Sequence, residues 1–98
     1  MITINLSLKN EVLYNGCEIS EVGGRLTLIT NPAEASNIVG RNAMVIIDNT
    51  MVYQRDEVVL TGPMAVWAYL VVFHQVVHKF NKVVYDDGRG GRVLVAQH

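Results

Sequence analysis

The chain has 98 residues, the size of one domain, of which half are hydrophobic and only 17% are charged. A monomer this small has too little interior to bury that much apolar surface, so we expect a subunit interface. A net charge of −1 provides no general basic field, which argues against binding to duplex DNA. The single cysteine, Cys17, excludes an internal disulfide and fits a reducing cytoplasm, where we expect the protein to reside.

Nothing in the sequence predicts export or membrane attachment. The N-terminal residues alternate between apolar and polar, and they lack the basic start and continuous apolar core of a signal peptide. Residues 64–77 are apolar, but they include His74 and Gln75 and are too short to span a bilayer. We therefore expect a soluble protein without a membrane partner.

The first third of the chain has the patterns of β-structure. Apolar residues alternate from Ile2 to Leu8, which indicates a half-buried strand. Asn15-Gly16 is the dipeptide best suited to a two-residue hairpin turn, because both positions favour positive φ. Gly23-Gly24 then interrupts the chain before another strand. The strands expected here occupy residues 2–8, 12–14, 17–19 and 26–30.

A helix start follows this region. Asn31 can cap a helix, Pro32 suits the first helical position, and Gly40 ends a short helix at about 32–39. The continuous apolar run 43–47 is typical of a strand that is covered on both faces. Two further short strands are expected at residues 51–53 and 58–60.

The last two-fifths of the chain predicts a long helix and a hairpin. Pro63 suits the start of a helix at about 62–79. The strand 82–86 and its partner 92–98 follow. Together the elements predict a compact single α/β domain over residues 1–98, with a mixed β-sheet, one long helix and one short helix. At helical spacing, Val66, Leu70, Phe73 and Val77 are expected to pack on the sheet, beside a stripe of Trp67, Val71, His74 and His78.

The loop between those two strands is the clearest candidate site. Glycines allow backbone N–H groups to converge on an anion, and arginines can make forked contacts to phosphate. The alternative interpretation is a solvated hairpin turn with glycines at positive φ. The candidate ligand-binding residues are Gly62, Gly88, Arg89, Gly90, Gly91 and Arg92, beside Asp86 and Asp87.

His74 and His78 are four residues apart, so they lie one turn apart on one helix face and can share a metal ion. The residues between them include no glutamate, so a zinc protease is not indicated. The alternative is that one histidine is a packed core residue and the other a surface residue near the helix C-terminus. His98 has its own alternative, a frayed terminus.

Spacing also predicts how these groups are arranged. A tight turn joins the helix to strand 82–86, so the two run antiparallel and Asp86 and Arg89 lie near Gly62 at the helix start. His78 and His98 then lie at the other end, four strand residues or about 13 Å away. One subunit would have a phosphate-binding end and a histidine end. They form a single site only when a second subunit brings its opposite end across.

Several features of residues 58–98 occur in an order that is typical of one family. Val-Val-Leu-Thr-Gly at 58–62 precedes Trp67, then come the two histidines, the Tyr85-Asp86 loop with Arg89, and a valine-rich strand that leads to His98. This segment resembles the small CRISPR-associated ring nucleases of type III systems. Their Asp-Pro-Arg sequence is Asp-Asp-Gly-Arg here, one residue longer, and the histidines here are four instead of three apart.

The resemblance implies a fold distantly similar to the sensor domains that bind cyclic oligoadenylates. It implies a metal-dependent phosphodiesterase, a hydrolase that cleaves cyclic tetra-adenylate to linear products in antiviral defence. Manganese is the expected ion, and a homodimer, possibly stacked on further dimers, is the expected assembly. The candidate catalytic residues are Asp86, Arg89, His74 and His78, and the candidate metal ligands are Asp86, His78 and His98.

Each role follows from the chemistry of the side chain. A carboxylate and an imidazole together suit manganese, and Arg89 would stabilise the charge that develops on the phosphate. A histidine could act as the general acid or base instead of a ligand. Three other functions stay open: a sensor or sink that binds the ring without cutting it, a manganese-dependent RNA-binding exonuclease that removes 3′ adenosines, and a purely structural oligomer.

Overall fold

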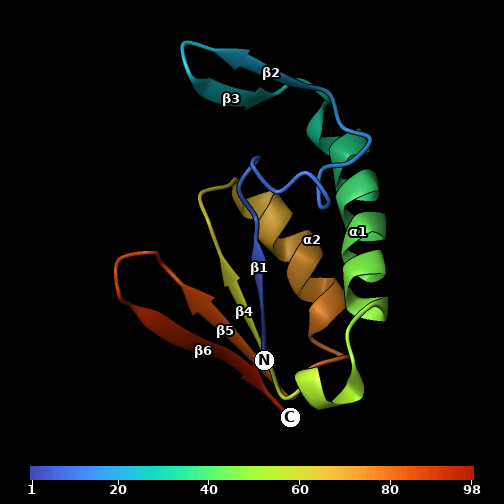
Figure 1. The fold of residues 1–98 in the computed structure, drawn as a ribbon, viewed down its shortest axis with the longest axis vertical. Coiled ribbons are helices and arrows are strands. Elements are labelled where there is room, and N and C mark those ends of the chain that lie inside the picture. The colour runs from blue at the N-terminus through green and yellow to red at the C-terminus, as the bar shows by residue number, and fades with distance from the viewer.

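The computed structural model describes residues 1–98 and has two helices side by side on one face of a four-stranded sheet (Figure 1). The strand order is β1-β4-β5-β6, where β1, β4 and β5 are parallel and β6 runs antiparallel to β5. The α/β class, the mixed sheet and the presence of two helices of unequal length are confirmed. The elements of the sheet layer are β1 (Ile2–Asn5), β4 (Glu57–Thr61), β5 (Lys82–Asp86) and β6 (Arg92–Gln97).

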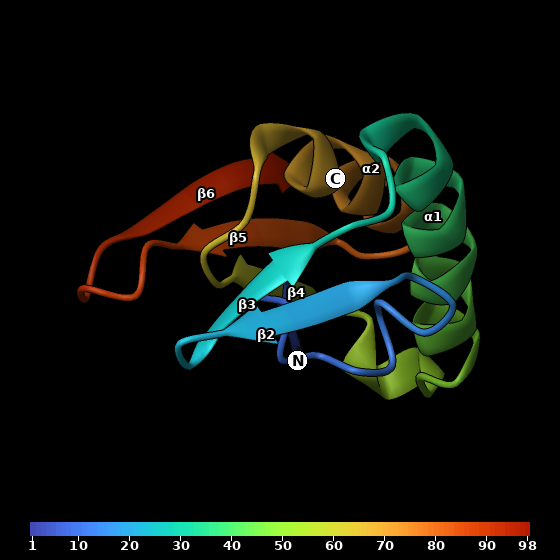
Figure 2. The ribbon, with the colours of Figure 1, turned by 90° about the horizontal axis from the view of Figure 1, so that it is seen from above.

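The helices form the two crossovers between parallel strands. Helix α1 (Pro32–Asp48) lies between β1 and β4 in the chain, and α2 (Val66–Val76) connects β4 to β5. Their buried faces meet the sheet in one hydrophobic core, which leaves the opposite sheet face without a helix (Figures 1 and 2). No helix is both long and apolar enough to cross a membrane. Large core residues include Ile4, Leu6, Leu13, Val39, Ile47, Val58, Leu60, Val72, Val76, Phe80 and Val83.

The prediction of a short helix at 32–39 gives the correct start of the helix but the wrong end. The side chain of Asn31 accepts a hydrogen bond from the Glu34 N–H at 2.9 Å, and Pro32 occupies the first turn. Gly40 does not end the helix, which continues to Asp48. A Cβ at Gly40 would lie 3.4 Å from the Val71 side chain, so this glycine lets α1 and α2 approach closely.

The strand predicted at 43–47 is therefore also wrong, because this run is the last part of α1. Ala43 and Ile47 are buried one turn apart, whereas Met44 and Val45 between them are exposed. The short strand expected at 51–53 is replaced by a single 3-10 turn, η1 (Val52–Gln54).

The predicted hairpin at Asn15-Gly16 does not form. Residues 11–16 form turns, and the Asn42 side-chain amide of α1 donates to the carbonyls of Leu13 and Asn15 (2.9 and 2.8 Å). The hairpin forms instead between β2 (Ile19–Val22) and β3 (Arg25–Leu28), with both Gly23 and Gly24 at positive φ.

Helix α2 is shorter than the predicted 62–79, because Ala65 has extended backbone angles and caps it while residues 77–79 form a turn. Its sheet-facing stripe was predicted correctly only in part, since Val66 and Leu70 are 73% and 63% exposed, whereas Phe73 is half-buried against the core. The buried residues are instead Ala68, Val72 and Val76. Small and β-branched residues permit close packing between α2, the sheet and α1.

Candidate functional site

The carboxyl ends of β1, β4 and β5 meet at one edge of the sheet, the upper edge in Figure 1. Ligands of parallel α/β sheets bind outside this edge, because helix N-termini and connecting loops converge there. The loop 87–91 and the start of α2 both lie at this edge, as predicted. The Thr61 hydroxyl links the ends of β4 and β5 by donating to the Asp86 carbonyl at 2.9 Å.

The two aspartates of the loop are engaged in hydrogen bonds within it. Asp86 accepts from the Gly88 N–H at 2.8 Å and forms an ion pair with Arg92 at 3.2 Å. Asp87 accepts from the N–H groups of Arg89 and Gly91 at 2.7 and 3.0 Å. Three loop N–H groups are thus directed at carboxylates, as in the hairpin-turn interpretation, and the Arg89 side chain remains available for a ligand.

A hollow of about 540 Å³ separates this loop from the chain that leads into α2. Gly62 has φ of +103°, and a Cβ there would lie 2.3 Å from the Asn5 side-chain oxygen, so only glycine fits. The Tyr69 hydroxyl donates to the Gly62 carbonyl and holds this segment against α2. The lining residues are Thr61, Gly62, Pro63, Tyr85, Asp87, Gly88 and Arg89, which brings together three of the predicted ligand-binding residues.

A second hollow of about 440 Å³ adjoins the first, because Pro63 lines both. It lies between the β2–β3 hairpin, the end of β1 and the start of α2, and Figure 2 looks down on this hairpin where it crosses the edge. Two basic residues, Lys9 and Arg25, line this hollow and were missed by the sequence analysis. Only tertiary structure brings them here, since each is an isolated charge in the sequence.

Three basic side chains at this edge have no ion-pair partner, although the Asp87 carboxylate also lines the first hollow. The structure contains two salt bridges, Met1 with Asp56 and Arg92 with Asp86. Lys9, Arg25 and Arg89 take part in neither, and all three are exposed. The uncapped first turn of α2 adds the positive end of a helix dipole to the same edge.

The three histidines lie at the opposite end of the sheet layer, around the C-terminus of α2. His74 and His78 are both exposed, with ring centroids 6.4 Å apart, so the interpretation of one as a core residue is wrong. The His98 ring Nε2 lies 2.7 Å from the Val77 carbonyl. A carbonyl only accepts, so Nε2 is the donor, and Nδ1 of the neutral ring presents a lone pair.

Within one chain, the histidines and the Asp86 loop are far apart. The His98 N–H donates to the Asn81 carbonyl, just before β5 begins, whereas Asp86 ends β5. Five strand residues separate these ends, or about 13 Å from Lys82 to Asp86. No three His, Cys, Asp or Glu side chains lie close enough together in one chain to hold a metal ion.

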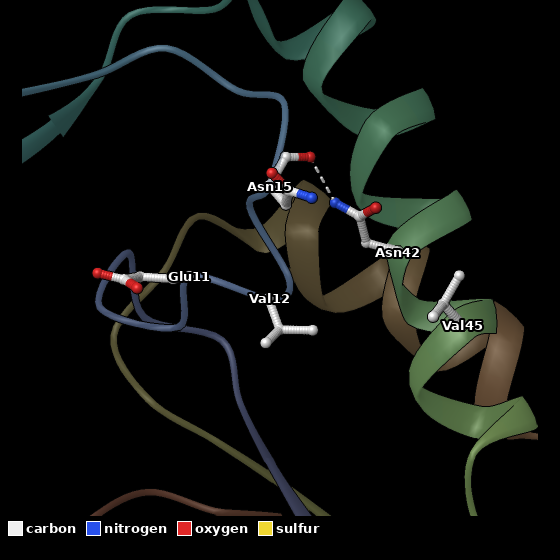
Figure 3. A pocket seen from close by; sticks show the side chains of 5 residues that line it. All are labelled: Glu11, Val12, Asn15, Asn42 and Val45. Atoms are coloured by element: carbon white, nitrogen blue, oxygen red, sulfur yellow. Dashed lines mark hydrogen bonds between the residues drawn. The ribbon is translucent and has the colours of Figure 1, made fainter.

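Two other candidate groups lie away from this edge and are engaged in hydrogen bonds or packing. The hollow beside α1 in Figure 3 is lined by Glu11, Val12, Asn15, Asn42 and Val45, and Asn42 is already committed to two backbone carbonyls. Cys17 packs against the hydrophobic core, and burial, with a smaller contribution from Glu34, raises the pKa of its thiol. A raised pKa lowers the thiolate fraction, which makes Cys17 a poor nucleophile.

Comparison of this chain with protein-family models, with curated proteins and with solved structures finds no match.

Proposed function

We propose that this protein binds cyclic tetra-adenylate at the carboxyl edge of its parallel strands and cleaves it as a ring nuclease. The observation that carries this proposal is the group of three basic side chains at the two adjoining hollows: Lys9, Arg25 and Arg89. A cyclic oligonucleotide presents several phosphates a few ångströms apart. It therefore suits a surface on which several basic side chains line two adjoining hollows, here the two hollows that share Pro63, better than a single pocket.

Cleavage needs groups that a single subunit does not bring together. Asp86 and Arg89 lie at the ligand edge, and the imidazoles of His74, His78 and His98 lie at the other end. We therefore place the reaction at a composite site in a homodimer, as the spacing of these residues in the sequence also predicts. Arg89 would grip the phosphate with its forked guanidinium, and an imidazole would hold or transfer a proton.

The residues present fit a divalent ion such as manganese. Each Asp86 oxygen accepts one hydrogen bond in the structure, which leaves a lone pair on each oxygen for a ligand. His98 Nδ1 supplies nitrogen while its other ring nitrogen is oriented by a backbone carbonyl, an arrangement that metal-binding histidines share. When bound, the ion would neutralise the phosphodiester and acidify a water molecule.

A second candidate function is binding without cleavage, as a sensor or sink for the ring. The ion pair of Asp86 with Arg92 favours it, because a metal must compete with Arg92 for this carboxylate. Binding would then depend on Lys9, Arg25 and Arg89 and would not require an ion.

A product assay distinguishes these functions. Cyclic tetra-adenylate is incubated with the protein, with manganese or with a chelator, and the products are separated by chromatography. A ring nuclease gives linear adenylates only with metal. A sensor gives a stable complex with intact ring. Removal of single 3′ adenosines from linear oligoadenylate, with no action on the ring, identifies an exonuclease.

Substitution of Arg89 tests the assigned site within the same assay. Arg89→Ala is expected to reduce turnover by at least tenfold, because the loss of one charge-stabilising contact costs about 1.4 kcal/mol or more. Arg41→Ala is the matched control, since Arg41 is an exposed arginine on α1. Equal turnover of both variants would show that the reaction, if any, occurs elsewhere. No interaction with either the ring or linear oligoadenylate would reject the proposed function.

A further inference from the structure

Strand β6 forms one edge of the sheet and leaves that edge open to solvent. It pairs with β5 only, so its outer backbone N–H and C=O groups have no strand partner (Figure 1). Val93, Leu94 and Val95 are 57%, 53% and 50% exposed. The stretch from Val93 to Ala96 contains no charge and no proline, two features that protect edge strands from pairing with another chain, although a β-bulge at Val95 interrupts its pairing with β5.

An apolar groove continues from this edge along the helix face. It has a volume of about 390 Å³ and is lined by residues of β4, α2, β5 and β6. Leu70, on its rim, is 63% exposed. The lining is entirely apolar: Leu60, Tyr69, Leu70, Phe73, Tyr85, Val93 and Val95.

The other edge of the sheet differs from β6. Strand β1 has four residues, and its exposed side chains are polar, Thr3 and Asn5. The Asn5 carbonyl also accepts a hydrogen bond from the Asn10 side chain at 2.7 Å, so the following loop already occupies part of this edge. Of the two edges, only β6 is both apolar and unpaired.

We propose that β6 pairs antiparallel with β6 of a second copy of this chain, about a two-fold axis that passes through Leu94. This register keeps like faces together over residues 93–95, beyond which the bulge at Val95 shifts the alternation of side chains. Val93 and Val95 both line the groove on the helix side, so Val93 lies opposite the partner subunit's Val95. Leu94 pairs with Val84 on the other face and lies opposite the partner's Leu94.

The same register is compatible with the charges. Arg92 is the only charged residue of β6, and it lies opposite the partner's Ala96, so no like charges face each other. The two sheets become one of eight strands, and the two grooves adjoin on its helix side. A second copy would supply hydrogen-bond partners for the open edge of β6 and further apolar side chains beside the groove.

Pairing in this register also brings the two separated ends together. Because the strands are antiparallel, Gly91 and Gly90 lie beside the partner's Gln97 and His98. The His98 ring is held against Val77, which directly follows α2, so it lies on the helix side of the sheet, as do Tyr85 and the hollow beside Arg89. The dimer thus assembles two composite sites, each from Arg89 of one chain and His98 of the other, whereas the Asp86 side chain alternates with Tyr85 and lies on the other face. This consequence rests on the proposed function, whereas the pairing itself does not.

The pairing is tested by molecular mass. The wild-type protein is expected to sediment as a dimer at micromolar concentration. Leu94→Lys is expected to be a monomer with unchanged circular dichroism, because two lysines would meet on the axis. Val45→Lys, at an equally exposed apolar residue of α1, should stay dimeric. A wild-type monomer, or a Leu94→Lys dimer, would overturn the pairing.

Cross-linking tests the register without a destabilising charge. In a Cys17→Ala background, Leu94→Cys is expected to form an intermolecular disulfide on mild oxidation, since residues opposite each other in antiparallel strands lie about 4.5–5.5 Å apart. Val45→Cys should remain free. Failure of Leu94→Cys to cross-link a protein that sediments as a dimer would reject the Leu94 axis.

Mixing two inactive variants separates the composite site from the proposed function. Arg89→Ala and His98→Ala each damage both sites of their own dimers, whereas a mixed dimer has one intact site. Equal mixing with subunit exchange is expected to restore about a quarter of wild-type turnover, because half the dimers are mixed and each has one of two sites. An active wild type without such recovery would reject the composite site. An inactive wild type would reject the proposed function and leave the pairing to the mass and cross-linking results.

Discussion

Tyr14 shows how one side chain holds an irregular segment against the sheet. It is 2% exposed, and its hydroxyl donates a hydrogen bond to the Leu6 carbonyl just beyond β1. This contact holds residues 6–14 as a compact loop against the sheet, whereas the Asn15-Gly16 dipeptide predicts a hairpin. Burial, with smaller contributions from Cys17 and Tyr69, raises the pKa of Tyr14 well above its ordinary value.

Tyr14→Phe is expected to lower the free energy of unfolding by about 1–2 kcal/mol at pH 7, because the Leu6 carbonyl loses its buried donor. The raised pKa predicts a pH dependence as well. Folding favours the protonated phenol, so this stabilisation is complete below about pH 10 and is lost as the pH rises further. Urea unfolding at pH 7 and between pH 9 and 11 measures both effects.

The difference between wild type and Tyr14→Phe isolates this phenol from the lysines that titrate in the same range. The difference should shrink as the pH rises above 10. Tyr53→Phe is the control, because Tyr53 is 79% exposed and makes no side-chain hydrogen bond that folding depends on. A constant difference across this range would show that the Tyr14 phenol does not couple folding to protons.

Only part of the candidate site could be predicted at the level of residues. Chain direction alone places Asp86 and Arg89 near Gly62, because a helix and the strand after it must run in opposite directions. The engagement of the carboxylates could not be predicted, since it depends on positive φ at Gly88 and Gly90. Nor could Lys9, because its position depends on packing between segments distant in the sequence.

Among the elements, α1 shows why local pattern fails. The run 43–47 is apolar at every position, and such a run is compatible with a covered strand or with a helix. The deciding information is its continuity with the preceding residues: Val39, Ala43 and Ile47 are buried at intervals of four. Gly40 obscured this continuity, because a glycine in that position is typical of a helix end.

Substitutions at Gly40 test the account of why a glycine lies inside α1. Gly40→Ala is expected to be neutral or to stabilise by up to about 1 kcal/mol, because a methyl group fits at 3.4 Å from Val71 and alanine favours helix. Gly40→Leu is expected to destabilise by about 1–3 kcal/mol, since the larger side chain must push α2 away. Thermal or urea unfolding of the two variants gives the comparison.

A matched pair at an exposed helix position provides the reference. Arg41→Ala and Arg41→Leu should differ by only a few tenths of a kcal/mol, because both are strong helix formers and Arg41 faces solvent. If Gly40→Leu were as stable as Gly40→Ala, the contact between α1 and α2 would not limit the size of this residue.

For the whole molecule, the important property is that charge is unevenly distributed although the net charge is only −1. The fold gathers Lys9, Arg25 and Arg89 at the carboxyl edge by placing the β2–β3 hairpin over the end of β1. Composition excludes a general basic field, and that inference holds for the molecule as a whole. Composition gives no information about a local positive field, which depends on how loops distant in the sequence pack together.

This local field predicts how the binding of cyclic tetra-adenylate depends on salt. Each phosphate contact that a basic side chain makes releases counterions, so log K falls with log salt by about 0.7 per contact. Lys9→Gln and Arg25→Gln are each expected to weaken binding in 50 mM salt and to reduce the slope by about 0.7. Titration calorimetry at four salt concentrations measures it.

The double variant extends the same test, with a reduction in slope of about 1.4 expected because two contacts are removed. Arg41→Gln removes the same unit of charge from the net total but lies on α1, away from the hollows, and should leave the slope unchanged. The comparison separates a local contact from the effect of net charge. Equal slopes for Arg25→Gln and Arg41→Gln would mean that the hairpin does not touch the phosphates, and the ligand would then be confined to the hollow beside Arg89.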